Sequence, residues 1–258
     1  MSSSFRMGRA LSLGASTMFR NLVPFAVLGA VVYAPLMVYR IKTYDHLQTL
    51  IADPSSDATL KALEILAITF AMGWGLRMVL SASVTYGVVQ RIRGQPAGLV
   101  TSLVKGVGRV PHTLAISIIV FILTVLPTVM LLFLSTFLAA LWAPCGIIIY
   151  CMYYVAVPAS VCERTGVGGS LLRSRDLTSG HKSALFGLVA IIFLIDLFAS
   201  KIVTKLFESS GGHTAVYVGL GVDIVIGILG ACVASACYCL LRNEKEGTSA
   251  DDLASVFD

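Results

Sequence analysis

Apolar residues fill most of this chain in long runs, and short polar or basic stretches separate the runs. A run of about 20 apolar residues is long enough to cross a hydrocarbon core of about 30 Å as a helix. The pattern therefore predicts an all-α, polytopic membrane protein with a single transmembrane domain over residues 1–241 and a polar tail over 242–258. Six transmembrane helices are expected, at about 22–39, 62–90, 113–134, 142–161, 183–200 and 214–241.

The stretches around the spans predict one long loop and several short helices. Residues 40–61 contain the sequence Asp-Pro-Ser-Ser-Asp, whose turn-forming residues indicate a loop, with a short helix before the proline as an alternative. The apolar stretch from Thr113 to Val161 is long enough to cross twice, with a break expected between Ser135 and Pro144. Apolar residues at helical spacing predict amphipathic surface helices at 1–20, within 91–112 and at about 170–178, the last ending at Gly180.

Each predicted surface helix precedes two predicted spans. The order predicts three copies of one unit around a common axis, which is a pseudo-threefold repeat. The match lies in the pattern more than in the residues themselves. The alternative is that the basic loops on one face of a membrane protein resemble one another without any repeat.

Composition and charge decide the class and the orientation. The chain is 57% hydrophobic and 13% charged, with a mean hydropathy of +0.86, whereas soluble domains are about 25% charged. Lysine and arginine concentrate in the N-terminal segment, the second and fourth loops and the tail, which places both termini in the cytosol by the positive-inside rule. The run 22–39 is longer than the core of a signal peptide, so we expect a retained first span.

A single arginine, Arg77, lies in the middle of the second predicted span. An unpaired guanidinium in lipid costs from about 2.5 to more than 10 kcal/mol, so it requires a carboxylate or water. Asp196 and Asp223 lie deep in the fifth and sixth spans, at a similar depth in the outer half of the membrane. We expect Arg77 to form a hydrogen bond with one of them. The cluster is either a structural ion pair or part of a solute or proton pathway.

Small residues recur every four positions along one side of the sixth span. Small side chains at this spacing let two helix backbones approach closely. The pattern predicts packing against another span of the same chain or against a partner protein. The residues are Gly219, Gly227, Ala231 and Ser235.

No pattern of catalytic or ligand-binding residues stands out. The six cysteines lie in or at the ends of apolar segments, which favours free thiols over disulfides. The chain has no metal-binding spacing, nucleophile motif or phosphate-binding loop. We therefore expect a protein that is not an enzyme, with no catalytic residue, cofactor or metal. No stretch interleaves basic and aromatic residues as a nucleic-acid groove does, so no nucleic acid is expected as a partner.

The basic loops indicate contact with lipid headgroups on the cytosolic side. Partners are then the lipid bilayer and either another membrane protein or further copies of this chain. The residues expected at this surface are Arg91, Arg93, Lys105, Arg109, Arg173, Arg175 and Lys182.

One segment carries a family resemblance. Pro158 and Glu163 precede a short stretch with Arg173-Ser174, Leu177-Thr178 and Gly180, and the tail begins Leu241-Arg242 and Lys245-Glu246-Gly247. This pattern resembles uncharacterised bacterial inner-membrane proteins of the YciC-like kind, which are related to the membrane domain of some glycerophosphodiester phosphodiesterases. The resemblance implies a six-helix, multi-pass protein of the bacterial inner membrane. It implies no catalytic residues, because that chemistry resides in a separate domain of the fused relatives.

These observations favour a non-enzymatic scaffold or accessory subunit of a membrane complex, with a lipid-organising role at the basic surface. The alternative is a transporter or channel for protons or a small solute that uses Arg77, Asp196 and Asp223.

Overall fold

The computed structural model describes residues 7–53, 55–92, 99–163, 165–207 and 212–247, and these residues form helices joined by short turns, with no strand among them. Six stretches in these residues are long and apolar enough to cross a membrane, which confirms the predicted class, an all-α polytopic membrane protein. The helices are α1 (Met7–Arg20), α2 (Leu22–Ala52), α3 (Ser56–Ile92), α4 (Leu99–Leu134), α5 (Thr136–Met152), α6 (Ala156–Glu163), α7 (Val167–Thr178), α8 (Lys182–Phe207) and α9 (Gly212–Glu246).

The loop predicted at 40–61 is wrong, because helix fills most of this stretch. α2 continues to Ala52, and α3 begins at Ser56. The turn itself follows the predicted chemistry: Asp53 Oδ1 accepts a hydrogen bond from Ser55 N at 2.9 Å, and Ser55 Oγ accepts one from Ala58 N at 3.2 Å. Residues 40–52 contain no proline or glycine, so α2 continues as a helix through this polar stretch beyond the end of the apolar run.

The predicted break after the third span is confirmed at Ser135. This residue separates α4 from α5, and its Oγ accepts a hydrogen bond from Phe137 N at 3.2 Å. The separate surface helix predicted within 91–112 is wrong, because Leu99–Leu134 is one helix with Pro111 inside it. Of the three predicted repeat units, only the first and third thus have a distinct short helix, α1 and α7, before their spans.

The fourth span is not the continuous helix predicted over 142–161. α5 ends at Met152, a turn follows, and α6 begins at Ala156. Pro158 has no backbone N–H to donate and its ring crowds the preceding turn of helix, so the break comes just before it. Ala156 N donates instead to the Tyr153 carbonyl at 3.0 Å. The short helix α7 then ends as predicted, with Gly180 at a φ of +92°, a conformation that favours glycine.

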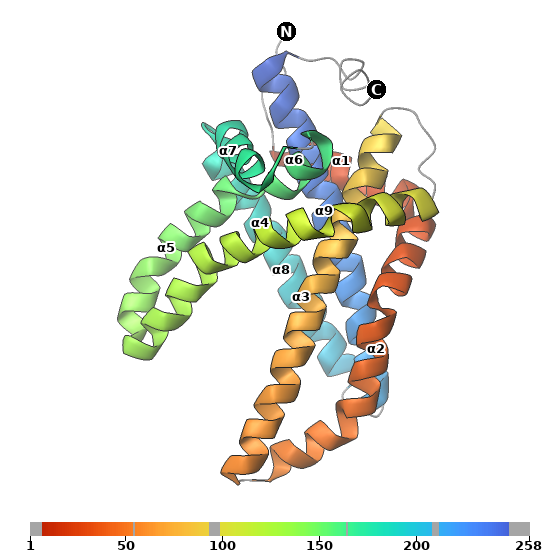
Figure 1. The fold of residues 1–258 in the computed structure, drawn as a ribbon, viewed down its shortest axis with the longest axis vertical. Coiled ribbons are helices and arrows are strands. Elements are labelled where there is room, and N and C mark those ends of the chain that lie inside the picture. The colour runs from red at the N-terminus through yellow and green to blue at the C-terminus, as the bar shows by residue number, and fades with distance from the viewer. Residues whose placement is uncertain (1–6, 54, 93–98, 164, 208–211, 248–258) are drawn as a thin grey trace.

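Helix α9 occupies the centre of the molecule. It packs against α1, α2, α3, α7 and α8, and both clusters of buried apolar side chains include its residues. Figure 1 shows α9 running beside α2 and α3, while α4 and α5 form a hairpin that diverges from the lower ends of α2 and α3. All six cysteines are free thiols, as predicted, and four of them are buried in these clusters.

Glycines allow the closest approaches to α9. A Cβ on Gly14 of α1 would lie 2.7 Å from the Val233 Cα, and a Cβ on Gly29 of α2 would overlap Ile224. Because backbone cannot move aside as a flexible side chain can, α1 crosses α9 here only with glycine in place. α1 was expected at the membrane surface, and the structure adds that its Ala10, Gly14 and Met18 face is buried against the protein.

Candidate functional site

Two groups of charged side chains lie along α9, and the first is the cluster deep in the predicted membrane region. Asp223 of α9 forms an ion pair with Arg40 of α2, whose Nη1 lies 3.4 Å from the Asp223 Oδ2. The expected direct contact between Arg77 and an aspartate is wrong: Arg77 makes no hydrogen bond or ion pair with any described residue. Arg77 nevertheless lies close enough to act electrostatically on the Asp223 carboxylate.

Asp196 of α8 completes this group without joining the ion pair. It interacts electrostatically with Asp223, but it forms no ion pair within the part of the chain that the structure describes. The structure thus brings the three predicted residues near one another around Asp223. The sequence interpretation missed Arg40 because it assigned this residue to a loop, whereas the continuation of α2 carries it beside α9.

The predicted contact between the second and sixth spans is present. The Ser235 Oγ donates to the Thr85 Oγ1 at 3.1 Å, and both residues are fully buried. A Cβ on Gly227 would lie 3.3 Å from Leu80, and Ala231 is buried in the same cluster. These residues of the small-residue face therefore pack within the chain. At Gly219, the first residue of this face, an added Cβ would meet nothing within 4 Å, so no close packing is present there.

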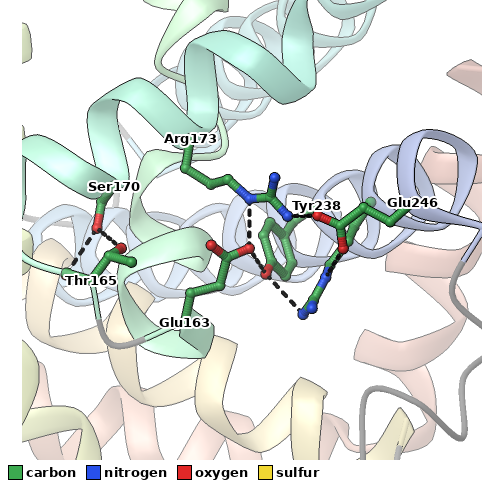
Figure 2. Close-up of polar contacts among 7 residues, drawn as sticks. Glu163, Thr165, Ser170, Arg173, Tyr238 and Glu246 are labelled. Carbon is green, nitrogen blue, oxygen red and sulfur yellow. Dashed lines mark hydrogen bonds and ion pairs between the residues drawn. The ribbon is translucent and has the colours of Figure 1, made fainter. Parts of the chain in front are cut away.

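The second charged group joins the ends of α6, α7 and α9. Figure 2 shows the Glu163 carboxylate between Arg173 of α7 and Tyr238 of α9. Glu163 Oε1 accepts from Arg173 Nε at 2.8 Å and from the Tyr238 hydroxyl at 2.7 Å. Arg173 also pairs with Glu246, and Arg242 Nε donates to the other oxygen of Glu246 at 2.7 Å. Two acids and two arginines thus balance one another.

A freed backbone carbonyl explains how α7 docks beside this group. The turn after α5 leaves the Met152 carbonyl without a helical partner. The Ser174 Oγ donates to it at 2.9 Å and the Thr178 Oγ1 at 3.2 Å, and both side chains are fully buried. Because these residues are four apart on α7, their hydroxyls reach the same side of the helix. α7 therefore closes the gap that the break in the fourth span opens.

The two stretches that carry the family resemblance meet in this group. Glu163 and Arg173 come from the first stretch, and Arg242 and Glu246 come from the second. Pro158 marks the break, while Ser174 and Thr178 satisfy the carbonyl that the break exposes. Sequence reasoning found these residues as a pattern, but it did not foresee that they bind one another.

Among the residues predicted to form the basic surface, Arg173 forms ion pairs within the protein and the other described side chains do not. Arg173 is held by two glutamates, so it is not a free lipid-binding group. Arg109, Arg175 and Lys182 form no ion pair with described residues. Arg93 and the side chains of Arg91 and Lys105 lie outside what the structure describes.

Comparison of the chain with protein-family models, with curated proteins and with solved structures found no match.

We predict that exchanging Arg40 and Asp223 restores most of the folded protein that either charge reversal alone loses. The exchange keeps an ion pair between α2 and α9, whereas each single reversal places two like charges together. The measurement is the yield of monodisperse protein after detergent extraction, together with its melting temperature. Rescue by the exchange of Arg77 and Asp223, with no rescue by Arg40 and Asp223, would contradict the observed pairing.

We also predict that Ser174→Ala or Thr178→Val alone costs little, while the double variant loses about 1–3 kcal/mol of stability. Either hydroxyl can satisfy the Met152 carbonyl, and removing both leaves a buried acceptor unpaired. Thermal unfolding in detergent measures the difference. Ser179→Ala is the matched control, because this exposed side chain makes no hydrogen bond to a described residue. Equal losses in the double variant and in the control would overturn the role of the carbonyl.

Proposed function

We propose that this protein is a non-enzymatic, multi-pass protein of the bacterial inner membrane that serves as a scaffold or accessory subunit of a membrane complex. In this proposal both termini lie in the cytosol, and the basic loops organise lipid at the cytosolic surface. The lysine and arginine bias of the loops supports the orientation. The resemblance to YciC-like proteins supports the inner membrane.

The observation that carries the proposal is an aspartate on an uncovered helix. α8 packs mainly along α9 and buries Leu185 and Leu188, but most of its other large apolar side chains are exposed; Phe193, for example, is 63% exposed. Asp196 is half-buried and lies three residues from Phe193, so it lies at the edge of this exposed surface. A carboxylate in the membrane requires a partner, and lipid tails offer none. A second protein packed on α8 would cover the apolar side chains and supply a partner for Asp196.

The use of the remaining polar groups supports a structural protein. Asp223 joins α2 to α9, Ser235 joins α3 to α9, and Glu163 joins α6 to α7 and α9. The contacts of α9 with α2, α3 and α6 connect helices that lie far apart in the sequence, while the contact of Glu163 with α7 joins consecutive helices. Polar side chains that fix helix positions favour a structural role, because a catalytic or transport site needs polar groups that are free to change charge.

One observation favours a second candidate, a transporter or channel for protons or a small solute. Arg77 has no ion pair among the described residues, and it acts electrostatically on the nearby Tyr154. The Tyr154 hydroxyl is itself buried without a hydrogen bond. Two unpaired polar groups at this depth could face a polar solute. The scaffold is preferred because the Arg40 ion pair already occupies Asp223, the central carboxylate of the cluster.

The decisive experiment places a photoreactive amino acid at Phe193 in native membranes. The proposal predicts a cross-link to a protein, either a different chain or a second copy, identified by mass spectrometry. Leu188 is the matched control, because it lies on the same helix and is fully buried. At Leu188 we expect cross-links within the chain alone.

Two results would contradict the scaffold. One is a Phe193 cross-link to lipid alone, with the protein purifying as a monomer without partners. The other is proton or solute flux in liposomes that Asp196→Asn and Asp223→Asn abolish while the protein remains folded. That second result would establish the transporter.

A further inference from the structure

Helix α1 has two different sides, and only one of them is explained by the fold. Ala10, Gly14 and Met18 are buried against α9. The opposite side of the helix is exposed, and its residues do not pack on the protein. This exposed side consists of Arg9, Ser12, Leu13, Ser16, Phe19 and Arg20; we call it the α1 outer face.

The two arginines of the α1 outer face lie on the same side of the helix. They are 11 residues apart, which is about three helical turns or about 16 Å, so they point in the same direction. Ser12 and Ser16 lie between them, and their hydroxyls donate to the Arg9 and Leu13 carbonyls of the same helix at 3.1 and 3.0 Å. Short side chains bonded to their own helix leave the space between the guanidinium groups open.

Neither arginine is neutralised by the residues that the structure describes. Arg9 and Arg20 form no ion pair with any described residue, in contrast to Arg173 and Arg242, which both bind glutamates. The guanidinium groups of the α1 outer face can therefore bind an external anion. Arginine binds phosphate through paired, charge-assisted hydrogen bonds.

The surroundings indicate that this anion belongs to a membrane. Phe19 is 66% exposed beside Arg20, and α2, the first span, begins at Leu22 with Val23 73% exposed. Asn21 alone separates α1 from α2, and its side chain donates to the Thr17 carbonyl at 2.9 Å, which holds the junction. Basic groups next to exposed apolar side chains at the start of a span match the boundary between headgroups and acyl chains.

We propose that the α1 outer face binds anionic phospholipid, with Arg9 and Arg20 each holding one phosphate group and Phe19 reaching the acyl chains. The inference rests on the lipid-organising part of the proposed function and assigns it to one helix. α1 then links lipid binding to the fold directly, because its other side packs on α9.

The test uses the full-length protein in detergent, titrated with phosphatidylglycerol or with phosphatidylcholine, and counts bound lipid by native mass spectrometry. The wild type should prefer phosphatidylglycerol. In Arg9→Gln/Arg20→Gln that preference should fall about 30-fold, because one arginine near an anionic surface contributes about fivefold. Arg9→Lys/Arg20→Lys should restore part of it.

The matched control is Arg175→Gln/Lys182→Gln, which removes the same charge from exposed positions on α7 and α8. It should keep most of the preference for phosphatidylglycerol. Equal losses in the two double variants would mean that the whole basic surface attracts lipid, which overturns the assignment to α1. Unchanged lipid binding, with loss of a co-purifying acidic protein, would overturn it in favour of a protein partner.

A melting temperature measured without added lipid confirms that each variant is folded, since these side chains make no contact that the fold requires. The Phe193 cross-link does not depend on anionic lipid. Failure of the lipid experiment would therefore leave the scaffold proposal standing, and failure of the cross-link would leave lipid binding at α1 standing.

Discussion

The close approach of α9 to its neighbours is the constraint on which the other contacts depend. Lipid tails are as apolar as leucine, so helices in a membrane gain little from hiding apolar surface and associate through close packing. Glycine makes that packing available where α1 and α2 meet α9, at Gly14 and Gly29. Along α3 the contact is made by Gly227, Ala231 and Ser235 of α9 itself. With α9 held this closely, Asp223 in its first half and the polar groups near its C-terminal end come within bonding distance of their partners.

The main effect of those polar groups is to determine which helices are neighbours, and their net contribution to the free energy of folding is small. An ion pair removed from water, such as Arg40 with Asp223, adds little net stability, because the cost of desolvating the two charges offsets their attraction. A mispaired arrangement, however, would leave charges without partners in lipid, which costs several kcal/mol. Asp223 in the first half of α9 and Tyr238 with Arg242 near its C-terminal end thus favour one arrangement of the helices. Glu163, which accepts from both α7 and α9, extends the same selection to the short helices.

The sequence predicted the parts of the fold that depend on local chemistry. Spans follow from apolar length, the break between Ser135 and Pro144 from an apolar stretch long enough to cross twice, and the end of α7 from Gly180. It did not predict which arginine pairs with Asp223, because that depends on where two helices cross. The role of Ser174 and Thr178 was hidden for a different reason: their acceptor is a backbone carbonyl, which no residue type reveals. Gly14 was overlooked because an amphipathic helix was expected at the membrane surface.

Helix α9 is the element around which both the proposed scaffold and the proposed lipid-binding helix are arranged. The close crossing of α1 and α9 is tested most directly by the melting temperatures of Gly14→Ala and Gly8→Ala in the same detergent. Both changes lie on α1 and raise helix propensity, but a Cβ at Gly8 would meet nothing within 4 Å. We predict that Gly8→Ala melts at or slightly above the wild-type temperature, and that Gly14→Ala loses about 1–3 kcal/mol of stability through overpacking. Equal melting temperatures for the two variants would contradict the close crossing of α1 and α9.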